Sequence, residues 1–342
     1  MNIENMTSTR ERYLDISKGI GIWCIVLLHF ENGFFPSWLN VFISSFMITI
    51  FYVVAGFIMA EKASVRNPKQ FFKHRLKQLG IPYLWWSGVI IVFDSLLWAL
   101  HYYDGYFIAR EIYKTLILSG VGTLWFLSAL FFGEIAWYYM KERQAFFIII
   151  FLVVVVVYRF TYSNLFDGHA GIAYKLIKEP FISLDKACGA TFYIAFGYYF
   201  YKIFDTWLKK ADSLKLIIYA IILWVVTYYT ACHLHSIVGK ADSYLWSYLA
   251  PVIGPITLLF TAKALENARY MRVFEYWGVN SLCLMLVHYS FVLVLCGVID
   301  KYILGFDSYY GARTLVYFMI SIPVLYGITL LINAKARFLL GK

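Results

Sequence analysis

Residues 13–30 read YLDISKGIGIWCIVLLHF, an almost continuous apolar run near the start of the chain. The run approaches the ~20 apolar residues that a helix needs to cross the hydrocarbon core of a bilayer. It has no small-residue cleavage motif, and mostly polar residues precede it. We therefore interpret it as a retained membrane-spanning helix rather than a cleaved signal peptide. Asp15, Lys18 and His29 lie within it.

The rest of the chain has the composition of a membrane protein. Hydrophobic residues make up 61% of the 342 residues and charged residues only 15%, whereas soluble domains carry about 25% charged residues. Aromatic residues make up 20%, and Trp and Tyr in excess are typical of the two membrane interfaces. This balance excludes one large soluble core, because too little polar surface remains to cover it.

Ten mostly apolar stretches predict an all-α, polytopic transmembrane helix bundle that forms a single integral membrane domain, residues 1–342. The predicted spans are 14–34, 41–60, 81–101, 116–139, 145–162, 184–203, 214–232, 246–265, 279–299 and 313–335. The longest connection predicted on the outer side is residues 163–183.

The distribution of Lys and Arg predicts the orientation of this bundle. With the N-terminus inside, more than two thirds of these residues fall in cytoplasmic segments, as the positive-inside rule requires. Both termini are therefore predicted to be cytoplasmic. The net charge of +10 then reflects loop composition rather than nucleic-acid binding.

The connection 61–80 is the most basic part of the chain, and residues 69–79 (KQFFKHRLKQL) have the pattern of an amphipathic helix. The apolar face is predicted to hold Phe72, Leu76 and Leu79. Two interpretations remain open. The segment is either a surface helix that binds anionic lipid or a cationic cradle for a phosphate-bearing cytosolic donor.

In the first predicted helix, the spacing of the charged residues places them on one face, and two glycines lie beside them. Asp15 and Lys18 are three residues apart and can pair on one helix face. Lys18 and His29 are eleven residues apart, so they share a face with an axial separation of about 16 Å. Gly19 and Gly21 allow the close approach of another helix or of a slender ligand. Alternatively, Lys18 only reaches the interface and His29 only caps the helix.

Three further ionisable residues lie inside predicted spans, where an unpaired polar group is costly. His288 is either a site residue or a packed partner in an interhelical hydrogen bond. Glu134 is expected to pair with a cation on the cytoplasmic side. Asp94 is expected to be paired in the same way as Glu134, and its position says less about function.

A buried imidazole, a cation and an apolar passage suffice for acyl transfer. An imidazole is a good general base for a sugar hydroxyl near neutral pH, and a cation binds phosphate or stabilises developing negative charge. The sequence contains no GxSxG elbow that would predict a covalent acyl-serine. Its five cysteines show no metal-ligand spacing, so neither a metal site nor a disulfide is predicted.

Five segments together resemble the membrane acyltransferase type 3 family, and within it the fucose 4-O-acetylase-like branch. Their order is LDISKGIGIWCIVLLH (14–29), FYVVAGFIMA (51–60), HRLKQLGIPYLWW (74–86), TLWFLSALF (123–131) and EYWGVNSLCLMLVHYS (275–290). Each segment alone is a weak signal, but the ordered set covers nearly the whole chain.

This resemblance implies a multi-pass enzyme of the bacterial inner membrane. Such enzymes move an acyl group, usually acetyl from cytosolic acetyl-CoA, to a sugar hydroxyl of a surface glycan or its lipid-linked precursor. The candidate catalytic residues are His29 and Lys18: His29 matches the family's catalytic histidine, and Lys18 matches a position that is usually Arg. We expect Lys18, Lys73, Arg75 and Lys77 to bind the donor. The candidate substrate-contacting or supporting residues are Asp15, Trp125, Glu134 and His288.

The expected partners are therefore acetyl-CoA, a sugar or glycan acceptor and membrane lipid, without nucleic acid; a homo-oligomer stays open. We predict that the pantetheine arm passes along the side of Gly19 and Gly21 to His29, and that the acceptor enters from the outside. Three alternatives exist: an exporter or transporter of glycan intermediates, an unrelated multi-pass acyltransferase with an Asn/His pair, and a scaffold with structural histidines.

Overall fold

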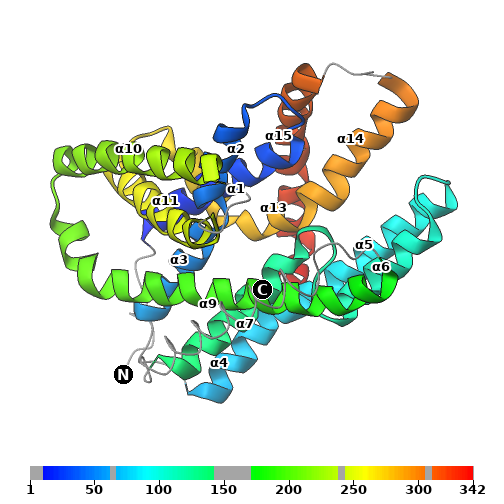
Figure 1. Cartoon of the computed structure of the whole chain (residues 1–342), viewed down its shortest axis with the longest axis horizontal. Helices are drawn as coiled ribbons and strands as arrows, with labels where there is room; N and C mark the ends of the chain where they lie inside the picture. The colour runs from blue at the N-terminus through cyan, green and yellow to red at the C-terminus, as the bar shows by residue number, and fades with distance from the viewer. Residues whose placement is uncertain (1–10, 62–66, 142–170, 238–242, 305–309, 342) are drawn as a thin grey trace.

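The computed structural model describes residues 11–61, 67–141, 171–237, 243–304 and 310–341, and these residues are helical apart from short connections. In chain order the elements are α1 (Arg12–Phe30), α2 (Ser37–Met47), α3 (Thr49–Glu61), α4 (Pro68–Arg75), the π-helix η2 (Leu76–Gly80), α5 (Ile81–Ala99), α6 (Gly105–Leu116), the 3-10 helix η3 (Gly122–Leu124), α7 (Trp125–Met140), α9 (Ile172–Lys210), α10 (Ser213–Ile237), α11 (Ser243–Leu265), α12 (Met271–Val279), α13 (Ser281–Val287), the π-helix η5 (His288–Leu293), α14 (Val294–Ile299), the π-helix η6 (Asp300–Leu304), α15 (Tyr310–Lys335) and the 3-10 helix η7 (Arg337–Leu340). Figure 1 shows α10 and α11 packed side by side on the opposite side of the molecule from α5 and α6.

Among the described residues, six helical stretches are long and apolar enough to cross a membrane, which confirms a polytopic helical membrane protein. They are Arg12–Phe30, Ser37–Glu61, Pro68–Ala99, Ser213–Ser236, Ser281–Tyr302 and Arg313–Lys335. Each overlaps a predicted span, and Ala250–Leu265 of α11 is a shorter apolar helix within another. The predicted total of ten spans and the predicted orientation stay predictions.

The predicted span 116–139 is wrong at its start. The chain leaves α6 at Leu116, and α7 begins only at Trp125. Between them, Leu118, Gly120 and Gly122 have positive φ angles of 59°, 78° and 52°. A right-handed helix cannot continue through such angles. The result is a folded-back connection where a continuous span was expected.

The predicted outer loop 163–183 is wrong from Ile172 onward, because α9 is one helix of 39 residues that runs from Ile172 to Lys210. It includes Pro180 in its interior and continues past both ends of the predicted span 184–203. Lys, Glu, Leu and Ile flank this proline, and all four types are tolerated in helices. Figure 1 shows α9 passing α3 and α7. The predicted span 145–162 and residues 163–170 lie outside the described residues.

The predicted amphipathic helix at 69–79 is confirmed as α4 and η2, which continue directly into α5. Asn67 caps its start, since the amide of Gln70 donates to the Asn67 side chain at 2.9 Å. Of the predicted apolar face, Leu79 is buried, whereas Phe72 and Leu76 are exposed. Phe71 stacks on Tyr138 of α7 with ring centroids 4.2 Å apart, whereas Phe72 is 42% exposed. This contact fixes α4 against α7.

Helices α1 and α12 cross at the closest approach that backbones allow. A Cβ atom on Gly19 would stand 1.8 Å from the carbonyl oxygen of Phe274, and one on Gly278 would stand 1.7 Å from that of Asp15. On another face of α1, a Cβ atom on Gly21 would stand 2.7 Å from the side chain of Ile50. Helices therefore fill the space beside both α1 glycines, and the predicted ligand route along them is wrong.

This crossing gives a stability prediction. Gly19→Ala should force α1 and α12 apart and cost about 1–3 kcal/mol of folding free energy. The thermal midpoint of the detergent-solubilised protein should fall accordingly. Gly88 on α5 is the matched control, because nothing lies within 4 Å of the position of its added Cβ. Gly88→Ala should leave the midpoint unchanged or raise it, and equal midpoints for the two variants would contradict the described crossing.

Candidate functional site

Two cavities lie along α1, one at His29 and one at Lys18. The His29 cavity has a volume of about 340 Å³ and is lined by His29, Asp94, Tyr103, Phe107, Arg110, Glu111, Lys114, Val121, Gly122, Thr123, Tyr289, Ser290 and Val294. The Lys18 cavity has a volume of about 200 Å³ and is lined by Lys18, Phe51, Val54, Ala55, Ile58, Arg75, Leu79, Phe126, Leu130, Glu134, Ser281, Leu282 and Met285. The first is rich in polar groups and the second is largely apolar.

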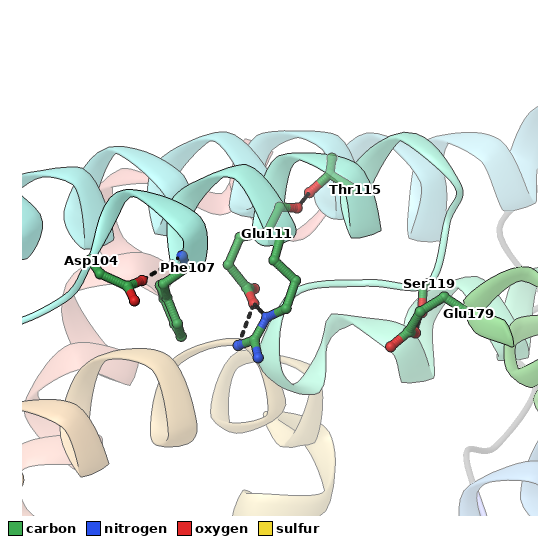
Figure 2. Close-up of polar contacts among 7 residues, drawn as sticks. Asp104, Phe107, Glu111, Thr115, Ser119 and Glu179 are labelled. Atoms are coloured by element: carbon green, nitrogen blue, oxygen red, sulfur yellow. Dashed lines mark hydrogen bonds and ion pairs between the residues drawn. The ribbon is translucent and has the colours of Figure 1, made fainter. Parts of the chain in front are cut away.

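Helix α6 supplies one wall of the His29 cavity. Its start is fixed by Asp104, whose side chain accepts a hydrogen bond from the amide of Phe107 at 2.7 Å. Figure 2 shows Asp104, Glu111 and Thr115 along this helix. After α6, the folded-back connection brings Ser119 to Glu179 of α9, to which its hydroxyl donates at 3.0 Å. The connection between α6 and α7, which was predicted to be the start of a membrane span, therefore helps to form the cavity.

His29 and His288 form a direct pair next to this cavity. Nε2 of His288 lies 3.1 Å from Nδ1 of His29. His288 is 0% exposed, so it stands behind the ring that lines the cavity. It also begins the π-helix η5, which places Tyr289 and Ser290 in the cavity wall. Short π-helical turns of this kind are rare and occur frequently at functional sites.

Backbone carbonyls fix the protons on this pair. Nδ1 of His29 lies 2.9 Å from the carbonyl oxygen of Ile25, and Nδ1 of His288 lies 2.7 Å from that of Leu284. A carbonyl oxygen only accepts, so each Nδ1 carries hydrogen. Nε2 of His288 must then accept the hydrogen that His29 shares between it and Ile25, because two N–H groups cannot face each other. Nε2 of His29 is left with a free lone pair.

Charged groups surround the rest of the His29 cavity. The Glu111 carboxylate accepts hydrogen bonds from Arg110 at 3.2 and 3.3 Å. Burial raises the pKa of Glu111, while the neighbouring Lys114 and Arg110 oppose that rise. Asp94 is also buried, at 4% exposed, and lines the same cavity. Among the described residues, no hydrogen bond or ion pair engages its carboxylate.

The Lys18 cavity brings together two ion pairs. Lys18 pairs with Asp15 at 2.7 Å, and Arg75 pairs with Glu134 at 2.8 Å. Both pairings agree with the sequence analysis, which expected a Lys18 partner three residues away and a cation for Glu134. Because each carboxylate is buried, removing either member of a pair would leave an uncompensated charge. The lining therefore combines three charged residues, Lys18, Arg75 and Glu134, with mostly apolar walls.

The two cavities approach each other where η3 meets α13. The hydroxyl of Thr123, which lines the His29 cavity, donates to the carbonyl of Met285, which lines the Lys18 cavity, at 2.6 Å. Among the described residues, none lines both cavities. Lys18 and His29 remain separated by the rise of α1, about 16 Å. A slender molecule that connected the two cavities would have to displace this contact.

Five of the predicted site residues are outside the lining of both cavities. Asp15 and His288 still contact it, because Asp15 pairs with Lys18 and His288 contacts His29. The other three lie apart from it. Lys73 and Lys77 are exposed on α4 and η2, on the far side of the helix from Arg75. The ammonium nitrogen of Lys186 lies over the ring of Trp125, 4.2 Å from the ring centroid. The separation of Lys73 and Lys77 from Arg75 follows from helix geometry, since residues two positions apart face different directions.

Several residues that line the His29 cavity were not predicted as site residues. Asp94 was noted as a carboxylate within an apolar span, where an ionisable residue is a functional candidate. The expectation that it pairs with a cation as Glu134 does is wrong, because no described cation bonds to it and it lines the His29 cavity instead. Arg110 and Glu111 lie in a segment predicted to be a connection, so their role depends on the helix and the fold-back that the structure shows. No sequence pattern pointed to Tyr103 or Ser290.

The comparisons with known proteins agree with this geometry at the level of the family. Residues 11–334, nearly the whole chain, match the acyltransferase family described as the acyltransferase domain. No curated protein matches the chain, and no solved structure does. The match to the family includes both cavities, the histidine pair and five of the six membrane-spanning stretches in full. The chain therefore belongs to the acyltransferase type 3 family and is an integral, multi-pass membrane acyltransferase.

Proposed function

We propose that this acyltransferase is an O-acetyltransferase of the bacterial inner membrane. It moves acetyl from cytosolic acetyl-CoA to a hydroxyl of a surface glycan or of its lipid-linked sugar precursor. The observation that carries the proposal is the histidine pair, which leaves a basic nitrogen of His29 on a polar cavity. General-base catalysis by such an imidazole contributes about 10²–10⁴-fold to a rate.

The Lys18 cavity supports the assignment of the donor. Its apolar walls suit a pantetheine arm, and Lys18 and Arg75 lie in its lining. Lys73 and Lys77 are exposed on the opposite face of the same helical segment as Arg75, outside this cavity, so we assign the donor to Lys18 and Arg75 rather than to these two lysines. Lys18 is about 16 Å along α1 from His29, so its role in this proposal is to hold the donor rather than to act on the acyl carbon.

The reaction then takes place at the boundary of the two cavities. The arm enters past the contact between Thr123 and Met285 and presents the thioester to His29. Nε2 of His29 takes the proton of a sugar hydroxyl as its oxygen bonds to the acetyl carbonyl carbon. The carbon–sulfur bond breaks, and the proton passes from Nε2 to the departing thiolate. The products are free CoA and an acetyl ester, and His29 returns to its starting state.

The release of CoA tests this function against export. Purified protein in detergent is mixed with acetyl-CoA and with surface glycan isolated from cells that lack the gene. We expect free CoA to accumulate only when the glycan is present, and the glycan to gain the mass of acetyl groups. A protein that exported glycan intermediates would release no CoA in detergent, and that result would contradict the proposal.

A further inference from the structure

Asp94 of α5 is a buried carboxylate whose partner is absent from the described part of the chain. Its residue is 4% exposed, and it lines the His29 cavity. Neither Arg110, which pairs with Glu111, nor any other described side chain bonds to it. Burying an ionisable group without a partner is costly. A ligand in the cavity that donates hydrogen bonds would remove this cost.

The groups around Asp94 restrict what that ligand can be. The cavity holds two carboxylates, Asp94 and Glu111, and two cations, Arg110 and Lys114. These charges balance, so the cavity does not select for a charged ligand. A carboxylate accepts hydrogen bonds and cannot donate them, and its two oxygens can take two neighbouring donors. Adjacent hydroxyls supply such donors without adding a charge.

The aromatic residues and the size of the cavity also favour a small, uncharged ligand that contains a ring. Tyr103 and Phe107 stack with ring centroids 4.1 Å apart, and Tyr289 lies 5.1 Å from His29 between ring centroids. All three line the cavity and offer apolar surface to the carbon–hydrogen face of a ring. At about 340 Å³, the cavity is at the low end of small-molecule sites, which span about 300–1,000 Å³.

We infer that Asp94 binds two adjacent hydroxyls of one uncharged sugar ring and so orients the acceptor hydroxyl at His29. This inference rests on the proposed function and adds to it a binding residue and a substrate class. The ring is a single sugar or the terminal residue of a glycan, which suits a cavity at the low end of small-molecule sites.

A kinetic comparison tests the role of Asp94. Asp94→Asn keeps the shape of the side chain and removes its charge. Hydrogen bonds to a charged group are strong enough that the KM for the acceptor glycan should rise about 10- to 100-fold. The KM for acetyl-CoA should not change. Asp104→Asn is the matched control, since Asp104 is exposed outside the cavity and asparagine still caps a helix. An unchanged acceptor KM in Asp94→Asn would overturn the inference.

A binding measurement without donor separates this inference from the proposed function. Saturation-transfer NMR would use methyl glycosides of common hexoses and deoxyhexoses, together with an amino-sugar glycoside as a cationic probe. We expect a neutral glycoside with adjacent free hydroxyls to bind wild-type protein and His29→Ala, and to lose binding in Asp94→Asn. Binding of the amino sugar alone, equal binding in Asp94→Asn, or no binding to wild type would overturn the inference. Failure of the proposed function would instead appear as wild-type protein that releases no CoA.

Discussion

Replacing His29 with alanine should lower acetyl transfer about 10²–10⁴-fold, because the variant lacks the base that takes the proton of the acceptor hydroxyl. The loss should appear in kcat, measured as glycan-dependent CoA release by purified protein. The side chain lines a cavity rather than filling a core, so the variant should insert and purify like wild type. Size-exclusion profiles and thermal midpoints check this expectation.

His235→Ala is the matched control for this variant. His235 is exposed on α10, where its Nε2 lies 3.2 Å from the hydroxyl of Ser37, and it lies outside the lining of both cavities. Its removal should leave kcat unchanged. Near-normal acetylation by purified His29→Ala would contradict the assignment of His29 as the base.

His288→Leu should lower kcat about 10- to 100-fold with little change in either KM. The hydrogen bond from His29 to His288 is present in the resting enzyme and persists when Nε2 of His29 takes up a proton. The donor ring is then a cation, and charge-assisted hydrogen bonds are about twice as strong as neutral ones. A contact that strengthens as the proton moves stabilises the transition state more than the bound substrates, so its loss appears in kcat.

The variant His288→Gln distinguishes a role of His288 in positioning His29 from a role in packing alone. Its amide oxygen can accept from Nδ1 of His29, so His288→Gln should recover a substantial part of the activity that His288→Leu loses. Leucine fills the buried position better than glutamine does, so the stabilities of the two variants should follow the reverse order. If activity instead follows stability, with His288→Leu the more active variant, then His288 is only a packing residue.

The sequence was sufficient to predict the class of fold and the family. Long apolar stretches leave few alternatives to membrane-spanning helices, and six of them are found where predicted. The pairing of Lys18 with Asp15 was also predictable, because it depends only on helix geometry within α1. The pairing of Arg75 with Glu134 joins residues far apart in the chain. The sequence indicated a cation on the cytoplasmic side as the partner of Glu134, but not which residue supplies it.

The parts that could not be predicted depend on backbone geometry and on contacts between distant segments. The positive φ angles at Leu118, Gly120 and Gly122 turn the start of an apparent span into a connection, and apolar content does not reveal them. Gly19 was compatible with a ligand or with a helix, and only the position of α12 decides between them. The contact between His29 and His288 needs the π-helical turn of η5 beside the end of α1.

We propose that donor and acceptor reach His29 from opposite ends of the bundle. Transfer across a sealed membrane tests this proposal most directly. Proteoliposomes are loaded with acetyl-CoA in the lumen, and acceptor glycan is supplied only outside. We predict that acetylated glycan accumulates outside while CoA is formed inside. Acetylation that occurs only when acetyl-CoA and glycan share one compartment would contradict the claim.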